Sequence, residues 1–175
     1  MNNQVLLDNL RSIPDFPKKG INFRDVTTLY KNAECVQIML EELYELYRDK
    51  GITKIVGIES RGFIMASALA ARLNCGIVLA RKPGKLPATV IKESFSKEYG
   101  VDTIEMHIDA IEENDVVLIH DDLLATGGTA KAAYKLVQNF HPKKTYINFL
   151  IEIKDEGLHG RDLFEGIELT TLMTV

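Results

Sequence analysis

The sequence is poor in the residues and patterns that mark several large classes of protein. It has 175 residues, no tryptophan and only two cysteines, Cys35 and Cys75, which are far apart and lack the spacing of metal ligands. Two such cysteines do not make a disulfide framework, so a reducing compartment is expected. No apolar run approaches the length of a membrane span, and the first residues lack the apolar core of a signal peptide. We therefore expect a cytoplasmic protein with no membrane partner.

A basic surface is also missing. The formal net charge is −4, which gives no sign of a nucleic-acid partner. The phosphate-binding signatures G-x-x-x-x-G-K-[ST] and G-x-G-x-x-G are absent, and the four histidines include no H-E-x-x-H metal site. The length and an apolar content of 46% fit one globular domain that buries roughly two-thirds of its extended-chain surface.

One stretch, VVLIHDDLLATGGT, carries the clearest chemical signal. Its apolar run Val116–Ile119 predicts a buried parallel strand, and Asp121 and Asp122 follow where that strand is expected to end. The small residues Ala125–Thr129 then turn into a helical pattern, and free amides at a helix start favour an anion. Two carboxylates would repel a phosphate, so they suit sugar hydroxyls or a Mg²⁺-bearing pyrophosphate. His120, beside them, is interpreted as structural.

Strands and helices are predicted to alternate, which implies a mainly parallel sheet flanked by helices. The two strand-helix-strand units are Lys54–Ile58, Phe63–Leu73 and Ile77–Ala80, then Val116–Ile119, Thr129–Phe140 and Thr145–Ile151. Apolar spacing predicts further helices over Gln4–Ile13 and Glu34–Lys50. Partial alternation predicts a ribbon of two strands, Thr89–Phe95 and Thr103–Ile108, and a last strand over Glu168–Met173.

Two further segments have the composition of anion sites. The turn Glu59–Gly62 lies between a predicted strand and helix, where amides and the Arg61 guanidinium could hold a second anion. The loop after Ala80 packs Arg81, Lys82 and Lys85 close together, and such a loop could neutralise a polyanionic small molecule. An exposed turn and a solvated basic loop are the ordinary alternatives for these two segments.

Four segments together resemble the type I phosphoribosyltransferases, and the adenine phosphoribosyltransferases in particular. They are the loop DDLLATGGT, the turn Glu59–Gly62, the segment PDFP-x-x-G-x-x-FRDV from Pro14 to Val26, and S-x-E-Y-G from Ser96 to Gly100. The resemblance implies one phosphoribosyltransferase domain over residues 1–175, with a purine-binding hood at about 1–30 and a flexible β-ribbon flap at 89–108. It also implies the transfer of a phosphoribosyl group from phosphoribosyl pyrophosphate (PRPP) to adenine, giving AMP and pyrophosphate.

The resemblance implies a role for each matching residue. Those expected to bind PRPP are Asp121, Asp122, Ala125, Thr126, Gly127, Gly128 and Thr129. Those expected to bind pyrophosphate are Glu59, Ser60, Arg61, Arg81, Lys82 and Lys85. Those expected to bind adenine are Asn22, Phe23 and Arg24, with Glu98 as the catalytic residue and Tyr99 in the lid.

The family also implies features that single residues do not carry. Mg²⁺ is expected as a cofactor held through PRPP, with no direct protein ligand. A homodimer is expected, and a cis peptide between Glu59 and Ser60. Two other functions stay open: transfer to another base such as xanthine, and a non-catalytic PRPP-sensing regulator. A panel of bases would distinguish transfer to adenine from transfer to another base. A PRPP-sensing regulator would need a DNA-binding extension or a basic face, which this sequence does not show.

Overall fold

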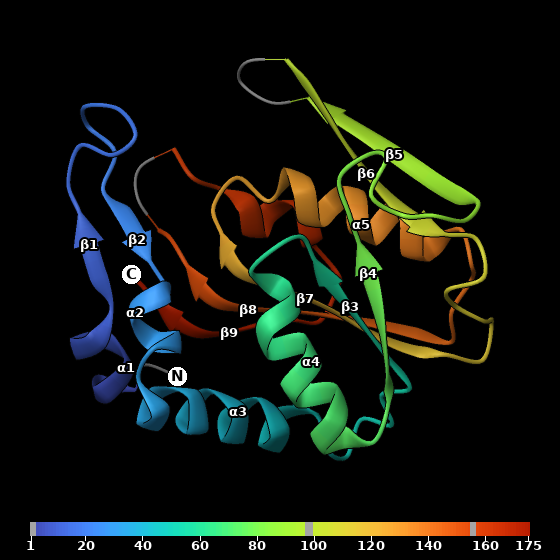
Figure 1. Ribbon diagram of the computed structural model, residues 1–175, viewed down its shortest axis with the longest axis horizontal. Coiled ribbons are helices and arrows are strands. Elements are labelled where there is room, and N and C mark those ends of the chain that lie inside the picture. The colour runs from blue at the N-terminus through green and yellow to red at the C-terminus, as the bar shows by residue number, and fades with distance from the viewer. Residues whose placement is uncertain (1–2, 97–99, 155–156) are drawn as a thin grey trace.

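Short apolar runs build the centre of the molecule. The computed structural model describes residues 3–96, 100–154 and 157–175. Its central sheet has the strand order β4-β3-β7-β8-β9, and every neighbouring pair is parallel. Figure 1 shows this sheet with helices on both sides, as the sequence predicted. The strands are β3 (Lys54–Ile58), β4 (Gly76–Ala80), β7 (Val116–Leu124), β8 (Lys144–Glu152) and β9 (Leu169–Thr174).

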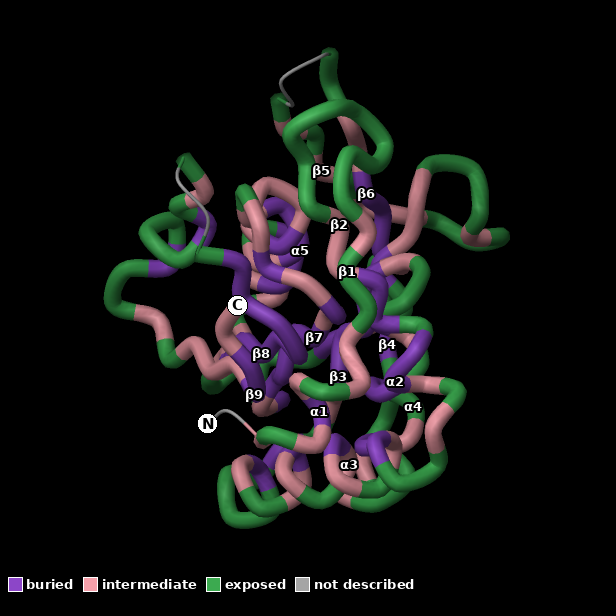
Figure 2. The backbone as a smooth tube through the Cα atoms, turned by 90° about the vertical axis from the view of Figure 1, so that its left-hand side faces the viewer, coloured by how far each residue is buried: buried purple, intermediate pink, exposed green. Residues whose placement is uncertain are grey.

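Alternation along the strands divides the core into two layers. In β7, Leu118 packs in the layer that contains α3 and α4, whereas Val117 packs in the layer that contains α5. Both side chains are fully buried, because successive residues of a strand point to opposite faces and helices cover both. The sheet therefore appears largely purple in Figure 2. The helical elements are α1 (Gln4–Asn9), α2 (Thr27–Tyr30), α3 (Ala33–Tyr47), α4 (Gly62–Leu73), α5 (Gly128–Gln138) and the short 3₁₀ helix η1 (Gly160–Phe164).

Two antiparallel ribbons lie outside the central sheet. One joins β1 to β2 near the N-terminus, and the other joins β5 to β6 above α5 in Figure 1. The second ribbon buries Ile104 and Met106 in the same layer as α5, and Lys135 of α5 bonds Glu93 of the ribbon at 2.8 Å. The ribbon strands are β1 (Arg11–Ile13), β2 (Phe23–Asp25), β5 (Val90–Ser96) and β6 (Val101–His107).

The N-terminal helix is shorter than the sequence predicted. The prediction of a helix over Gln4–Ile13 was wrong after Asn9, where the chain becomes extended and enters β1. Strand β1 pairs with β2, and Arg11 donates to the carboxylate of Asp25 at 2.5 Å. Pairing with a distant segment thus overrides the local apolar spacing that favoured a longer helix.

The helices in the described ranges are too short or too polar to cross a membrane. The longest, α3, is an amphipathic surface helix that begins at the Asn32 cap, whose side chain accepts from the amides of Glu34 and Cys35. It buries Met39 and Leu43 against the sheet layer. Helix α3 therefore packs in the same core layer as Ile55 of β3 and Leu118 of β7.

Candidate functional site

The loop between β7 and α5, Ala125–Thr129, is called here the phosphate loop. Gly127 adopts a left-handed conformation with φ +76°, and no side chain caps the start of α5. The first amides of the helix are therefore left for an anion. A cavity of about 140 Å³ lies at this turn, and all five loop residues line it. The remaining lining residues are Asp121, Leu123, Ala130 and Phe149.

The two adjacent carboxylates have different surroundings. Asp121 is partly exposed and lines the cavity of the phosphate loop, whereas Asp122 is only 4% exposed and accepts from Nε of Arg61. Burial, and then the charge of Asp122, raise the pKa of Asp121 well above its usual range. The pair therefore presents one carboxylate to the cavity and uses the other to hold a guanidinium.

Strand β7 does not end at Ile119, so that part of the sequence prediction was wrong. Its ladder with β3 stops at His120, but its ladder with β8 continues to Leu124. The polar residues Asp121 and Asp122 were interpreted as the end of a strand because apolar content falls there. They remain in the strand because β8 still provides hydrogen-bond partners on one edge.

The turn Glu59–Arg61 follows β3 and lies beside β7. The peptide bond between Glu59 and Ser60 is cis, as the family resemblance implied. Helix α4 begins at Gly62, where an added Cβ would lie 2.8 Å from the carbonyl oxygen of His120 and 2.9 Å from Oδ1 of Asp121. Only glycine allows this close approach, which brings Arg61 to Asp122. The two predicted anion turns therefore lie at neighbouring strand ends, and an ion pair joins the second turn to the strand that leads into the first.

The basic residues at this edge are each paired with a carboxylate. Glu59 accepts from Nε of Arg81 at 3.2 Å and from the amide of Lys82 at 2.9 Å, and it lies 3.5 Å from Nζ of Lys85. Although burial opposes it, these bonds lower the pKa of Glu59 below its usual value. The side chain of Lys82 pairs with Asp102 of β6. We call Glu59, Arg61, Arg81, Lys82 and Lys85 the charged cluster.

The residues expected to hold a base lie on the β1–β2 ribbon. Phe23 packs edge-on against Phe16, with ring centroids 5.2 Å apart. Arg24 pairs with Ser12 across the ribbon, and Asn22 is exposed. Asn22 lies directly before β2, and Arg24 lies in the middle of that strand. Glu98 and Tyr99 lie outside the described residues.

Comparison with known proteins gives the family. A phosphoribosyl transferase domain model matches residues 25–159. The adenine phosphoribosyltransferase of Phocaeicola vulgatus is 63% identical over the full length of both chains. The chain belongs to the adenine phosphoribosyltransferases. The solved structure of the enzyme from Thermoanaerobacter pseudethanolicus is 40% identical, covers 98% of this chain and 99% of its own, and has a TM-score of 0.92.

A second solved adenine phosphoribosyltransferase, from Giardia lamblia, was crystallised with 9-deazaadenine. It is 40% identical, covers 100% of this chain and 98% of its own, and has a TM-score of 0.92. The parallel sheet flanked by helices is therefore the fold of this family.

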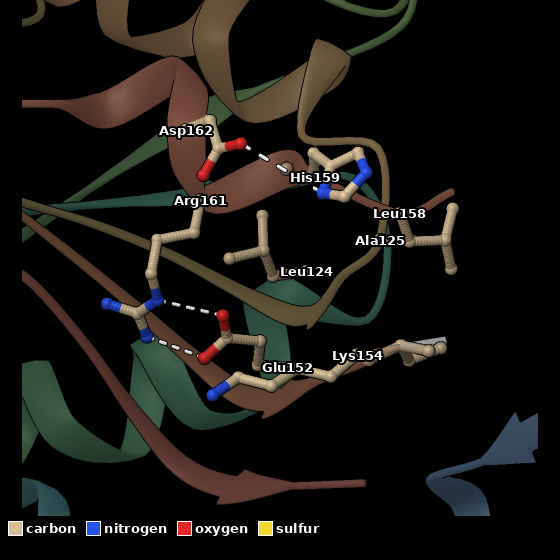
Figure 3. Close-up of a pocket in the computed structure, with 10 residues that line it drawn as sticks. Leu124, Ala125, Glu152, Lys154, Leu158, His159, Arg161 and Asp162 are labelled. Carbon is tan, nitrogen blue, oxygen red and sulfur yellow. Dashed lines mark hydrogen bonds and ion pairs between the residues drawn. The ribbon is translucent and has the colours of Figure 1, made fainter. Parts of the chain in front are cut away.

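Sequence reasoning missed a charged pair that lies beside the phosphate loop. Glu152, at the end of β8, and Arg161, in η1, form a bidentate ion pair next to the phosphate loop (Figure 3). They line a second cavity of about 320 Å³ that also includes Ala125. A charged residue closing an apolar strand, followed closely by Gly-Arg, was the available signal in the sequence.

Tyr30, at the end of α2, is a second residue that the sequence did not indicate. Its hydroxyl is buried and has no hydrogen-bond partner among the described residues. Burial, and then the charges of Asp122 and Asp121, raise the pKa of Tyr30 above its usual range. The N-terminal ribbon and its helix therefore lie within electrostatic reach of the acidic pair. In the described ranges, no group of three or more His, Cys, Asp and Glu side chains could hold a metal ion.

Proposed function

We propose that this chain transfers the phosphoribosyl group of PRPP to adenine, giving AMP and pyrophosphate, by means of the phosphate loop and the Glu59–Arg61 turn, which the Arg61–Asp122 ion pair fastens to β7. That ion pair is the observation that carries the proposal, because it ties the cluster of cations to the strand that leads into the uncapped start of α5. A sugar with a phosphate at one end and a pyrophosphate at the other has the matching distribution of charge.

The phosphate loop holds the 5′-phosphate. Its amides around Gly127 and Gly128 donate to the phosphate oxygens, and the hydroxyls of Thr126 and Thr129 add two further donors. The cavity of about 140 Å³ is large enough for one phosphate group but not for a nucleoside. Anchoring this end fixes the sugar, so that its reactive carbon is oriented for attack.

The acidic pair and the charged cluster bind the ribose and the pyrophosphate of PRPP. Asp121 faces the ribose hydroxyls, and Asp122 holds Arg61 towards the pyrophosphate. Arg81, Lys82 and Lys85 exchange their present carboxylate partners for pyrophosphate oxygens, while Ser60 contributes from the same turn. Asp121, which lines the cavity, would place a carboxylate near an ion carried by PRPP, so the site fits Mg²⁺ held through PRPP without a direct protein ligand. Such an ion would neutralise charge on the leaving pyrophosphate.

The N-terminal hood, residues 1–30, provides the base site. Phe23 packs on the purine face, while the carbonyl of Asn22 and the amide of Arg24 bond the edge of adenine. Hypoxanthine reverses the donor and acceptor on that edge, and the backbone cannot exchange its own. Glu98 shares a proton with the attacking purine, and Tyr99 closes over the base as part of the flap at 89–108.

The edge strand β4 supports a homodimer. Its side chains Ile77 and Leu79 are 39% and 37% exposed, and Ile64 of the adjacent α4 is 47% exposed. Apolar side chains on an unpaired edge favour contact with a second copy of the chain. We place this dimer in the cytoplasm, where the free thiols of Cys35 and Cys75 stay reduced. Leu79→Glu is expected to shift the sedimentation coefficient to that of a monomer.

The decisive experiment measures AMP formed from PRPP and adenine with Mg²⁺, beside hypoxanthine, guanine and xanthine. Buried donor and acceptor mismatches discriminate by about 10⁴-fold, so adenine should dominate the panel. Comparable turnover on hypoxanthine would contradict the base site. In the same assay, Glu98→Ala should slow the chemical step, as measured in a single turnover, with little change in melting temperature. Tight PRPP binding without any AMP would instead indicate a sensor.

A further inference from the structure

We propose that Arg161 is a positioning residue that, through Glu152, presses the backbone of Gly160 against the phosphate loop and so sets the affinity for PRPP. The inference rests on the proposed function, in which that loop holds the 5′-phosphate. No side chain of this segment needs to touch the substrate, because its effect passes through the main chain of the loop.

The contact between the two backbones is direct. The amide of Gly160 donates to the carbonyl of Ala125 at 3.1 Å. A Cβ added to Gly160 would lie 2.3 Å from that carbonyl oxygen and 3.0 Å from the nitrogen of Gly127. A Cβ added to Gly127 would lie 2.8 Å from the carbonyl oxygen of Gly160. Two glycines therefore allow the segments to meet with no side chain between them.

The ion pair behind Gly160 holds this contact in place. Arg161 donates from Nε to Oε1 of Glu152 at 2.7 Å and from Nη2 to Oε2 at 2.6 Å, and Nη1 reaches the carbonyl of Leu169 at 3.3 Å. Glu152 is 5% exposed, and its bonds to Arg161 lower its pKa. Figure 3 shows the fork of the guanidinium facing the carboxylate. Lysine cannot reproduce two parallel bonds of this kind.

A further bond fastens the same segment to the helix that carries the loop. Nζ of Lys131, in the first turns of α5, donates to the carbonyl of Leu163 at 2.7 Å. The amide of Lys131 donates in turn to the carbonyl of Gly127 at 2.9 Å. The 157–164 segment thus contacts both sides of the loop, at Ala125 and at α5.

The phosphate loop needs external support of this kind. It consists of small residues, and no side chain caps the helix that it starts, so few contacts of its own define its shape. An anion site made of amides binds well only if those amides are already oriented. Weakening the support should therefore reduce affinity for PRPP, whereas adenine, which does not contact this loop in the proposed site, should bind as before.

The test compares Arg161→Met with Arg161→Lys and with Arg72→Met, a control that removes an exposed Arg–Glu pair at the far end of α4. We expect Arg161→Met to raise KM for PRPP about tenfold, the equivalent of one charge-assisted hydrogen bond, with KM for adenine within about twofold. Arg161→Lys should show most of the same defect because the fork is lost. Arg72→Met should leave both constants unchanged.

Assays are run below the melting temperature of every variant, and Kd for PRPP is measured by calorimetry beside the kinetics. If KM for PRPP and KM for adenine change together, or if neither changes, the inference is wrong while AMP formation by the wild type still supports the function. If the wild type binds PRPP but makes no AMP, the proposed function fails, and the ratio of PRPP Kd values still decides the role of Arg161. Should Arg161→Met fail to fold, Arg161→Lys provides the same readout.

Discussion

The phosphate loop and the charged cluster bind anions by opposite means. The loop at Ala125–Thr129 offers backbone amides and has no carboxylate bonded to them in the described part of the chain. The cluster offers guanidinium and ammonium groups, each already paired with Glu59, Asp102 or Asp122. One region is preorganised for its ligand, and the other must exchange partners when the ligand arrives.

This difference suits the two ends of the proposed substrate. The 5′-phosphate stays in place through the reaction, so a fixed cradle of amides serves it well. Pyrophosphate must be held and then released, and cations that return to internal carboxylates lower the cost of releasing it. The loop therefore suits a group that stays bound throughout the reaction, and the cluster suits a group that is bound and then released.

The largest effect is expected from removing the residue that joins the two regions. Asp122→Ala should lower kcat/KM for PRPP by about 10²- to 10³-fold, because Arg61 loses its buried partner and the acidic pair is broken. Steady-state kinetics measure the loss, and circular dichroism checks that the protein is folded. Near-normal kinetics in a folded variant would remove the acidic pair from the mechanism.

A second prediction concerns the strand on which both regions depend. Burial, which outweighs a hydrogen bond to Asn148, lowers the pKa of His120 to about 4 from 6.5. The unfolded chain therefore takes up a proton below about pH 6.5 and the folded chain only near pH 4. Stability present above pH 6.5 should fall by about 3 kcal/mol as pH drops through that window.

His120→Leu should remove this contribution, since leucine binds no proton in either state. Urea unfolding at pH 7 and at pH 4.5 measures it, and the difference in unfolding free energy between the two pH values should be smaller in the variant. Other titrating groups contribute equally to both proteins. If the unfolding free energy fell by the same amount between the two pH values in the wild type and in His120→Leu, His120 would not be a source of the loss of stability in acid.

The third prediction tests whether the loop is preorganised. Gly127→Ala should raise KM for PRPP by about 10- to 100-fold, because φ +76° is unfavourable for alanine and its Cβ would meet the carbonyl oxygen of Gly160 at 2.8 Å. Gly128→Ala should have a smaller effect, since its Cβ meets only the ring of Phe95 at 3.2 Å. Equal effects of the two substitutions would contradict a loop defined by its left-handed residue.

The smallest effect concerns the exchange of partners in the charged cluster. Asp102→Asn removes the carboxylate that competes for Lys82, so pyrophosphate should inhibit about two- to fivefold more strongly at low salt. The difference should shrink as ionic strength rises. Product-inhibition constants measured at two salt concentrations provide the check. Weaker inhibition by pyrophosphate in Asp102→Asn would mean that Asp102 supports Lys82 instead of competing for it.

Local residue chemistry made much of this molecule predictable. Lys54–Ile58 was predicted at its observed bounds because a short apolar run buried on both faces has few other uses. The turn from β7 into α5 was predicted at residues 125–129, since glycine conformations and helix starts depend on near neighbours. The family resemblance added the reaction, which composition and spacing alone do not provide.

Features set by distant contacts were not predictable from the sequence. The separate partners of Asp121 and Asp122 follow from the neighbours of β7, and the helix prediction over Gln4–Ile13 failed because β1 pairs with β2. The ion pair of Glu152 with Arg161 joins two charged residues nine positions apart, and the sequence shows both residues without showing that they pair. Pairings between separate elements leave no periodic signal in the chain.

The uneven ladders of β7 have a mechanical consequence. Up to His120 the strand is bonded on both edges, and beyond it β8 alone continues the ladder among the described strands, while the amide of Asp122 donates to the carboxylate of Asp121 at 2.8 Å. The hydrogen-bonded ladder between β3 and β7 thus ends at the pair of Gly57 with His120, and the two chains separate beyond it. A sugar phosphate that bridges the loop and Arg61 would link the two chains there, so substrate binding should stiffen the centre of the protein as well as fill its cavity.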